Sequence, residues 1–463
     1  YARFGDKVSV INSRQSQGER YDQFKRAKRG EVQVMIGPRS ALFTPFGNLG
    51  LIIIDEEHEP SYKSESSPRY HARETSIKRA SLENARVVMG SATPSVEAYS
   101  QAMKGVYGLV RLNARYGSRP MPQVSIVDLR EELKAGNRSV LSRELREKMK
   151  LRFEKKEQVI LFLNRRGYAG FVSCRSCGHV MKCPHCDVSL SEHNNERLLC
   201  HYCGYEQELV SKCPECNSDK IRYFGTGTQK LEQEIQKQFP NASTIRMDVD
   251  TVTKKNSHEN ILNKFKNENI NILIGTQMVV KGHHFPNVTL VGVIAADSSL
   301  NIDDYRANER TFQILTQVAG RAGREKLPGK VIIQTYNPDN FSIQCAKQQN
   351  YNKFYNTEIL LREQLKYPPF CDIIVIGFSG ISEAELQDIG KRTYIYLNQE
   401  IKELFDNGKL DKNNIKIFKP MPAPIDKIQN RFRYRIIIKA KMTEEINEIL
   451  NKYLKKVYQK DTK

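Results

Sequence analysis

Four closely spaced C-x-x-C pairs constrain this 463-residue chain more than any other feature. The pairs are Cys174/Cys177, Cys183/Cys186, Cys200/Cys203 and Cys213/Cys216. A two-residue gap lets both sulfurs of a pair bind one metal ion from a tight turn, and eight thiolates suffice for two tetrahedral zinc sites. The spacing leaves open whether consecutive pairs or nested pairs share an ion. We therefore predict a two-zinc cysteine module over residues 172–222.

Other roles for these cysteines are less favoured. Four disulfides would suit a secreted domain, but we expect no secretory segment here, and pairs of this regularity are typical of metal sites. A reactive redox role for one pair is equally disfavoured. Cys345 and Cys371 lie alone in apolar surroundings and are expected to be small core residues.

The charge balance indicates a polyanionic partner. The chain has 73 Lys and Arg residues against 53 Asp and Glu residues, a net charge of +20. Such an excess attracts nucleic acid and makes the affinity depend on salt, because binding releases counterions. No apolar run approaches the ~18 residues that cross a bilayer, and no basic amphipathic helix stands out, so we expect no membrane partner. Thiols arranged for metal indicate a reducing cytosol.

Short runs of Val, Ile and Leu alternate with polar segments that suit helices. Near-continuous apolar runs of this kind predict buried parallel strands in an α/β fold. The predicted strands are residues 32–36, 51–54, 85–89, 159–163, 270–274, 290–294 and 331–333. Ligand groups in such sheets gather just beyond the carboxyl ends of the strands.

We divide the chain into four parts. A first lobe covers 1–112, and a second lobe covers 113–171 and 223–345, with the cysteine module at 172–222 inserted between its two segments. A small α+β domain covers 346–463. In that domain we predict strands at 372–378, about 415–419 and 433–439, a helix at 383–405 and a terminal helix.

An acidic segment, Asp55-Glu56-Glu57-His58, directly follows the predicted strand 51–54. A carboxylate at a strand end can hold Mg²⁺, usually through water. A neighbouring carboxylate can polarise the water that attacks a γ-phosphate. Taken alone, the segment could equally be a solvated acidic turn.

Two further motifs make the acidic segment more specific. Gly90-Ser91-Ala92-Thr93-Pro94 follows the next predicted strand, where hydroxyls and small side chains allow hydrogen bonding to the acidic strand end. Gln317-Val318-Ala319-Gly320-Arg321-Ala322-Gly323-Arg324 comes much later. Its two arginines share one helix face and could reach phosphates across a lobe interface as arginine fingers. Separately, this segment could be a basic helix end with glycine caps.

Aromatic and basic residues alternate in the loop after the acidic segment. They are Tyr62, Lys63, Arg69, Tyr70 and His71. Such residues stack on bases and bind phosphates. A polar loop whose tyrosines pack locally is the alternative. The position beside Asp55–His58 favours a loop that senses DNA.

In their order along the chain, these motifs resemble motifs II, III and VI of superfamily 2 helicases. Gly37–Phe43, which includes Arg39, resembles motif Ib, and Phe162–Tyr168 resembles motif IV. Gly275–Met278 followed by Lys281–Pro286 resembles motif V, which couples the nucleotide to the moving strand. The glycine loop 225–229 could also meet phosphates, but a lone glycine loop is weak support.

The aromatic loop and the eight cysteines between motifs IV and V narrow the resemblance to the primosomal replication-restart helicases. Residues 281–286, 422–425 and 430–435 support the same family, whereas a RecQ-type helicase carries its zinc module after the second lobe. The resemblance covers essentially the whole chain. It implies two RecA-like helicase lobes, the first incomplete, with a zinc-binding insertion in the second lobe and a small α+β C-terminal domain.

The resemblance implies an ATP-dependent 3′-to-5′ DNA helicase that recognises stalled or abandoned replication forks and initiates primosome assembly. The implied cofactors are ATP, Mg²⁺ and two Zn²⁺. The implied partners are forked and single-stranded DNA, single-strand DNA-binding protein, and primosome and replicative-helicase loading proteins. The implied form is a monomer in the bacterial cytoplasm, associated with the nucleoid.

The resemblance also assigns site residues. Asp55 positions Mg²⁺ and Glu56 activates water, while Gln317, Arg321 and Arg324 complete the site from the second lobe and Gly282 contributes to nucleotide binding. The residues implied to bind DNA are Arg39, Tyr62, Lys63, Arg69, Tyr70, His71 and Thr276. The zinc pairing it implies is nested: Cys174, Cys177, Cys213 and Cys216 hold one ion, and Cys183, Cys186, Cys200 and Cys203 hold the other.

The chain departs from the family pattern in one respect. No G-x-x-x-x-G-K-[ST] phosphate loop precedes the acidic segment, and the family's N-terminal DNA-binding modules are absent. Because the first residue is Tyr, we expect an N-terminally truncated sequence, which as given binds ATP poorly and is inactive. Two alternatives stay open: a non-catalytic zinc-containing module that binds DNA and protein, or another superfamily 2 translocase, acting on RNA.

Overall fold

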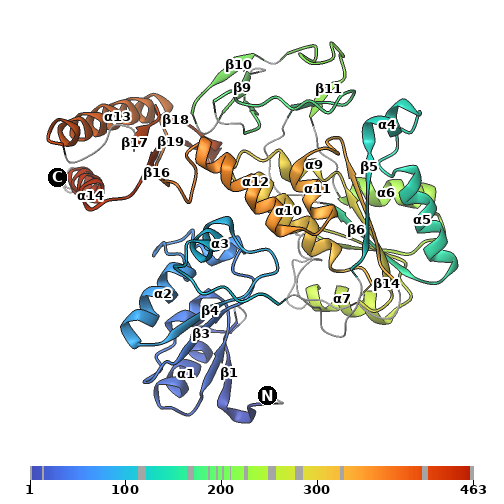
Figure 1. Cartoon of the computed structure of the whole chain (residues 1–463), viewed down its shortest axis with the longest axis horizontal. Coiled ribbons are helices and arrows are strands. Elements are labelled where there is room, and N and C mark those ends of the chain that lie inside the picture. The colour runs from blue at the N-terminus through green and yellow to red at the C-terminus, as the bar shows by residue number, and fades with distance from the viewer. Residues whose placement is uncertain are drawn as a thin grey trace. The chain divides into compact units, whose positions relative to one another are not determined.

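The computed structural model describes most of the chain. The described residues are 3–12, 15–112, 121–163, 172–185, 188–193, 197–200, 203–208, 210–223, 228–248, 257–276, 285–323, 328–408 and 415–458. They divide into two compact units, unit 1 at Tyr1–Gly108 and unit 2 at Leu109–Lys463 (Figure 1). The finer division of unit 2 into lobe, cysteine module and C-terminal domain stays a prediction.

Unit 1 is an α/β body built on two pairs of parallel strands. β1 (Val8–Val10) pairs with β2 (Val34–Ile36), and β3 (Leu51–Ile54) pairs with β4 (Arg86–Met89). The helices are α1 (Gln17–Lys28), α2 (Ala72–Glu83) and α3 (Val96–Met103), with short 3₁₀ helices η1 (Gly5–Lys7), η2 (Arg39–Phe43) and η3 (Pro60–Tyr62). The strands predicted at 32–36, 51–54 and 85–89 are confirmed, whereas β1 was not predicted.

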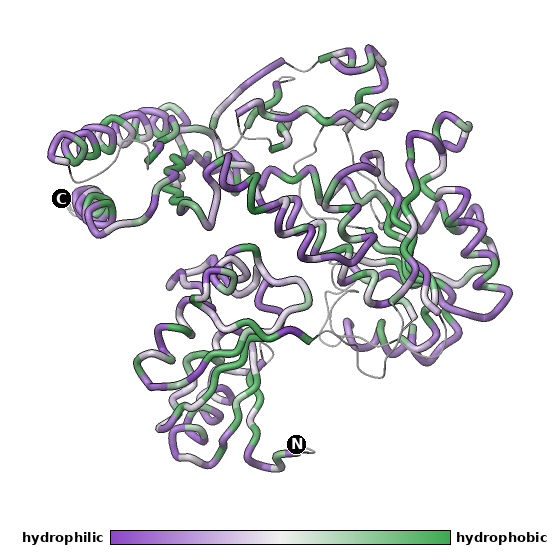
Figure 2. Tube along the Cα trace, in the orientation of Figure 1, coloured by the Kyte–Doolittle hydropathy of each residue, from purple (hydrophilic) through white to green (hydrophobic). Residues whose placement is uncertain are grey.

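Within the described residues of unit 1, one face of the β3–β4 pair is exposed. Leu51 and Ile53 of β3 are 50% and 67% exposed, and Val88 of β4 is 51% exposed. Parallel sheets are normally covered on both faces. The apolar face therefore agrees with an incomplete first lobe, and Figure 2 shows the same strands as hydrophobic stretches of the tube.

Unit 2 is built on a six-stranded parallel sheet in the order β12-β13-β6-β14-β15-β5. The strands are β5 (Gln123–Asp128), β6 (Gln158–Leu163), β12 (Thr244–Met247), β13 (Ile272–Gly275), β14 (Val288–Ile294) and β15 (Lys330–Thr335). The helices are α4 (Leu129–Lys134), α5 (Arg143–Glu154), α6 (Thr228–Gln238), α7 (Ser257–Asn267), α9 (Asp297–Leu300), α10 (Ala307–Ala319), α11 (Phe341–Lys347) and α12 (Tyr351–Gln364). The strands predicted at 159–163, 270–274, 290–294 and 331–333 are confirmed, and β5 and β12 were missed.

The central strands of this sheet are buried along their whole length, as a sheet between two helical layers requires. Leu145 of α5 and Leu231 of α6 pack against Leu161 of β6 in the core. Gly292 of β14 permits this contact, because a Cβ there would lie 2.8 Å from a Leu161 methyl carbon and 3.0 Å from Leu145. Tight packing of this kind fixes where the sheet presents its strand ends.

The cysteine module consists of short antiparallel strands. They are β7 (Val172–Cys174), β8 (Ser191–His193), β9 (Arg197–Leu199), β10 (Glu206–Glu208) and β11 (Ile221–Tyr223). β7 pairs with β11, and β9 lies between β8 and β10. The module therefore leaves the lobe by β7 and returns by β11, side by side.

The C-terminal part is an antiparallel sheet with two helices. Its elements are β16 (Asp372–Gly380), α13 (Glu383–Asp406), β17 (Ile415–Ile417), β18 (Met421–Ile428), β19 (Arg431–Ala440) and α14 (Glu444–Tyr458). All the predicted elements in this part are confirmed, and β18 was missed. Cys200 and Leu190 of the cysteine module share a core with Met421 and Ile437 of this sheet, so the two parts support one another.

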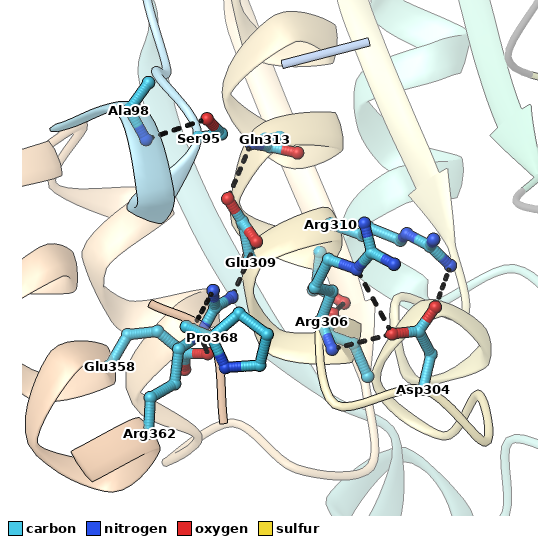
Figure 3. A network of polar contacts seen from close by, with 12 residues as sticks. Ser95, Ala98, Asp304, Arg306, Glu309, Arg310, Gln313, Glu358, Arg362 and Pro368 are labelled. Carbon is cyan, nitrogen blue, oxygen red and sulfur yellow. Dashed lines mark hydrogen bonds and ion pairs between the residues drawn. The ribbon is translucent and has the colours of Figure 1, made fainter. Parts of the chain in front are cut away.

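Arg362 of α12 is buried and bridges two buried carboxylates (Figure 3). Its Nη2 donates to Glu309 Oε2 at 2.6 Å, and its Nε donates to Glu358 Oε1 at 2.9 Å. Its Nη1 donates to the Pro368 carbonyl at 3.1 Å. Glu309 belongs to α10, which also carries Gln317. The network thus ties α10 to α12 and to the turn that begins the C-terminal part.

Among the described residues, no helix combines the length and the apolar composition that a membrane span requires.

Candidate functional site

The acidic segment and the segment after β4 are held together by backbone hydrogen bonds. The Gly90 amide donates to the Ile54 carbonyl at 2.8 Å, and the Glu57 amide donates to the Gly90 carbonyl at 3.1 Å. The Asp55 side chain accepts the Glu56 amide at 3.0 Å and remains exposed. The strand end therefore presents the Asp55 carboxylate to solvent, where a hydrated Mg²⁺ could meet it.

Glu57 differs from its two acidic neighbours, because its carboxylate is buried. It accepts the Ser95 amide at 2.5 Å and the Ser95 hydroxyl at 3.1 Å, and Arg73 lies 3.4 Å away. Burial raises the pKa of Glu57, while Ser95 and Arg73 act in the opposite direction. Glu57 thus joins α3 and α2 to the strand end.

His58 connects the acidic segment to the Ser-Ala-Thr motif. Its Nδ1 lies 2.7 Å from the Ser91 hydroxyl and 3.6 Å from a Glu56 carboxylate oxygen. The Ser91 hydroxyl also accepts the Thr93 amide at 3.0 Å. The predicted hydrogen bonding between these two motifs is confirmed. His58 therefore lies between the Glu56 carboxylate and the Ser91 hydroxyl.

The aromatic loop is fastened to the acidic strand end. The Tyr62 hydroxyl donates to the Asp55 carbonyl at 2.7 Å. Arg39 donates from one Nη1 to the carbonyls of Ser61 and Lys63, each at 2.8 Å. The loop and η2 therefore form one surface with Asp55, so a ligand on the loop lies close in structure to the acidic site.

The predicted DNA-binding side chains of the loop fall into two groups. Tyr70 is half-buried, with its ring 5.1 Å from the Phe43 ring and 6.0 Å from the Arg39 guanidinium. Lys63 and Arg69 are exposed. Tyr70 therefore packs against its neighbours. Lys63 and Arg69 are the side chains that a phosphate could reach in this conformation.

His71 is the N-cap of α2, and its Nδ1 accepts the Arg73 amide at 3.2 Å. Burial, followed by the Arg73 charge, lowers the pKa of His71 to about 4, so the ring is neutral near pH 7. In the unfolded chain, the His71 ring therefore binds a proton at a higher pH than it does in the folded protein. We expect the neutral His71 ring to contribute about 1 kcal/mol to the free energy of unfolding, after allowance for solvent screening. This contribution should be complete above pH ~6.5 and should be lost as the pH falls towards ~4.

An NMR titration of the His71 ring and unfolding curves at several pH values check this expectation. His71→Asn is the matched control, because asparagine caps a helix well and does not titrate. If the variant loses stability with acid as steeply as the unaltered protein does, the cap is not the cause.

The residues implied for the second lobe lie in unit 2. Gln317 is on α10, and Arg321 follows Gly320, which ends that helix; both side chains are half-buried. Thr276 follows β13 and is 8% exposed. Three of the predicted site residues, Gly282, Arg324 and Cys186, lie outside the described residues, as do residues 164–168 of motif IV and residues 277, 278 and 281–284 of motif V.

Four cysteines from the two ends of the module converge on one point. The sulfurs of Cys174, Cys177, Cys213 and Cys216 all lie within 4.8 Å of one another. Cys174 Sγ is 3.6 Å from Cys216 Sγ, and Cys177 Sγ is 3.5 Å from Cys213 Sγ. Zinc–sulfur bonds of about 2.3 Å in a tetrahedron place sulfurs about 3.8 Å apart, so this set fits one Zn²⁺. The arrangement is the nested one.

A second group of sulfurs comes from the middle of the module. Cys183, Cys200 and Cys203 lie within 4.8 Å of one another, and Cys183 Sγ is 3.4 Å from Cys203 Sγ. The three described cysteines fit a second Zn²⁺ that needs one more ligand. Together with the family match reported below, the two groups support zinc binding.

Zinc analysis of the reduced protein should find about two ions per chain. Cys174→Ser should lower the content to about one ion, since it removes a ligand from only the first group. Cys345→Ala serves as the control, because Cys345 is buried away from both groups and should leave two. One ion or none in the unaltered, unchelated protein would contradict eight-thiolate ligation.

Three family models match the chain. They are the helicase conserved C-terminal domain at residues 206–326, the PriA DNA helicase Cys-rich region domain at 183–207 and the primosomal protein N C-terminal domain at 363–463. Among solved structures, RecG bound to a three-way DNA junction aligns with 79% of this chain and 40% of that chain, at 12% identity. Its TM-score of 0.39 is too low to establish a shared fold.

Curated relatives named replication restart protein PriA match nearly the whole chain. The Bacillus subtilis protein is 49% identical over 98% of this chain and 55% of its own length. The Synechocystis protein is 45% identical over 95% of this chain and 53% of its own length. The chain thus spans about half the length of these two relatives. The Rickettsia typhi protein is 38% identical over 98% of this chain and 68% of its own length. The chain therefore belongs to the replication restart protein PriA family.

Proposed function

We propose that the full-length gene product is an ATP-dependent 3′-to-5′ DNA helicase that recognises stalled or abandoned forks and initiates primosome assembly. The observation that carries this proposal is 49% identity to a replication restart protein across 98% of the chain. The hydrogen-bonded contact between the acidic segment and Ser91 supports it, since a motor needs these two motifs in one place.

In this proposal, Asp55 and Glu56 perform the chemistry of unit 1. Asp55 is exposed at the end of β3 and holds Mg²⁺, which would neutralise charge on the phosphates. Glu56 takes the proton of the attacking water. Glu57 is excluded from both roles, because Ser95 and Arg73 occupy its carboxylate.

Unit 2 supplies the cationic half of the same site. Gln317 positions the nucleotide, and Arg321 and Arg324 stabilise the charge that develops on the transferred phosphoryl group. Gly282 lets the backbone approach the nucleotide closely. Arg321 lies directly beyond α10, the helix that the buried Arg362 network holds, and this supports a firmly positioned guanidinium.

DNA binding is proposed for the surface that the aromatic loop and η2 share. Lys63 and Arg69 bind phosphates, and Arg39, Tyr62, Tyr70 and His71 complete the contacts or position them. Thr276 of unit 2 is proposed as a further DNA contact. Because Tyr62 donates to the Asp55 carbonyl, a strand that displaces the loop would also disturb the magnesium ligand. This is a short physical route by which DNA could stimulate ATP hydrolysis.

The two-zinc module is proposed to help separate strands and to bind partner proteins. The partners are single-strand DNA-binding protein and the primosome and replicative-helicase loading proteins, for a monomer associated with the nucleoid in the cytoplasm. The module shares a core with the C-terminal sheet, and this supports its use as a rigid element.

The direct test compares nucleic acids as activators of ATP hydrolysis by the full-length gene product. We expect forked DNA to raise the rate at least about tenfold and RNA of equal length to raise it little. DNA affinity should also fall steeply with salt, because the chain carries a charge of +20. Stimulation by RNA alone would favour another superfamily 2 translocase. DNA binding without any ATP hydrolysis would favour a non-catalytic module.

A further inference from the structure

Unit 2 contains a cavity of about 920 Å³ that none of the residues proposed above lines. One wall comes from the cysteine module, at residues 178–182 and at Gln207 and Glu208. Another part of the lining comes from Asn301, Asn308 and Asn337 of the lobe. Its volume lies in the range of sites that hold organic ligands.

The walls of this cavity are fixed by direct contacts between the module and the lobe. Arg130 donates to the Cys177 carbonyl at 3.1 Å. Gly178, at φ +81°, lies so close to the lobe that a Cβ there would sit 2.4 Å from the Tyr336 carbonyl oxygen. Asn337 donates to the buried Asp297 carboxylate at 3.1 Å. These contacts therefore fix the walls of the cavity, which lies next to the group formed by Cys174, Cys177, Cys213 and Cys216.

The lining suits a heterocycle with mixed donors and acceptors. Side-chain amides come from five positions around it: Gln207, Asn301, Asn308, Asn337 and Asn340. An amide both donates and accepts, which is how asparagine and glutamine hydrogen-bond to the edge of a base. Val180, Met181 and Leu300 add apolar surface for the faces of a ring.

Asn301 provides an independent sign of a missing ligand. Its side chain is 6% exposed, and its Oδ1 accepts the Ser189 hydroxyl at 3.4 Å. Its Nδ2 is buried without a hydrogen-bond partner among the described residues. Buried amide donors are rarely left unsatisfied. The Asn308 side chain on α10 makes no hydrogen bond within the described part of the chain, and it is half-buried and lines the same cavity.

The charges around the cavity favour a base on a strand over a free nucleotide. Arg130 and Lys182 bring two positive charges, and Glu208 and Asp339 bring two negative charges, which cancel them. Arg130 is also paired with Asp128 at 2.6 Å. A free nucleoside triphosphate would carry several charges into this neutral site, whereas a base of single-stranded DNA leaves its phosphates outside.

We propose that this cavity accepts one unstacked base of single-stranded DNA, held between the cysteine module and the lobe by side-chain amides. The inference rests on the proposed DNA-helicase function and extends it to a site beyond the aromatic loop. Asn308 precedes Glu309 on α10, the helix that leads to Gln317 and Arg321, so the base contacts the helix that also serves the ATP site.

The test compares two oligonucleotides of about 15 nucleotides, one with bases and one with an abasic backbone, by fluorescence anisotropy with the full-length protein. We expect Asn308→Leu to weaken binding of the base-bearing strand about tenfold and to leave binding of the abasic strand unchanged. Gln207→Ala, which changes the part of the lining that the cysteine module supplies, should act in the same direction. Asn398→Leu, exposed on α13, is the matched control and should change neither affinity.

The outcomes separate the inference from the proposed function. If the unaltered protein binds neither strand, the proposed function fails. If it binds DNA but both cavity variants keep the full preference for the base-bearing strand, the cavity assignment is overturned. Competition by free deoxyadenosine monophosphate that both variants abolish would overturn the assignment to a strand.

Discussion

Glu56→Gln in the full-length gene product should abolish DNA-stimulated ATP hydrolysis, by a factor of about 10²–10⁴, while DNA affinity is retained. The substitution keeps the size and the hydrogen-bonding capacity of the side chain and removes only the base. Glu56 suits this role, because it stands at the strand end with a backbone φ of +48° and a half-buried carboxylate beside His58. Steady-state hydrolysis with saturating forked DNA measures the effect.

Two neighbouring substitutions serve as controls for that experiment. Glu65→Gln changes an exposed loop carboxylate and should leave both hydrolysis and binding unchanged. Glu57→Gln should instead lower the stability of unit 1, because it weakens the contacts with Ser95 and Arg73. Full turnover by Glu56→Gln would reject the assignment of the base, whatever the other two variants do.

Arg362→Met should destabilise unit 2 by about 3–5 kcal/mol, an effect large enough to unfold a domain of ordinary stability. The substitution leaves Glu309 and Glu358 buried without the cation between them, and it also removes the donor to the Pro368 carbonyl. Urea unfolding followed by circular dichroism measures the change in the free energy of unfolding.

The chain offers a closely matched control for the loss of a buried arginine. Arg392 forms the same i,i−4 ion pair with Asp388 at 2.6 Å, but its side chain is 70% exposed. Arg392→Met should therefore cost only about 0.3–0.5 kcal/mol. Equal effects of the two substitutions would show that burial of the Arg362 network contributes nothing. Adding Glu309→Gln and Glu358→Gln to Arg362→Met should restore part of the loss, because no unpaired charge then remains buried.

The strands that position the sites were predictable from the sequence, because buried parallel strands are nearly continuous apolar runs. β6 and β14 illustrate this, with every residue buried. β18 was missed, since Pro422 and Pro424 interrupt it and the pairing register shifts between Pro422 and Lys427. Proline is tolerated there because, among the described strands, β18 pairs with β19 alone and so has one edge without ladder hydrogen bonds.

The division of labour among the acidic residues was not predictable. Asp55, Glu56 and Glu57 are adjacent carboxylates, and only the positive φ of Glu56 and the later placement of Ser95 turn Glu57 inward. The role of Arg362 was equally hidden. In the sequence it is one basic residue of a polar helix, and its partner Glu309 lies 53 residues away. Contacts of this kind depend on tertiary packing and leave no local pattern.

The zinc ligands were predictable from the sequence, but the way they pair was not. Spacing identified the cysteines but left nested and consecutive pairing open, and the nested pairing came from resemblance alone. The structure brings Cys174 and Cys177 to Cys213 and Cys216, because β7 and β11 pair and carry the two ends of the module together. The contact between these two pairs joins residues far apart in the sequence, and it depends on how the whole module folds.

We propose that Asp55 and Glu56 of unit 1 and Gln317 and Arg321 of unit 2 act on one nucleotide. Spin labels placed genetically at Leu82 and Lys347, which are exposed on α2 and α11, would report the distance between the units in the full-length gene product. We expect a non-hydrolysable ATP analogue with Mg²⁺ and DNA to shift and narrow the distance distribution, and we expect Arg321→Ala to remove the shift. The same distribution with and without nucleotide in the unaltered protein would contradict it.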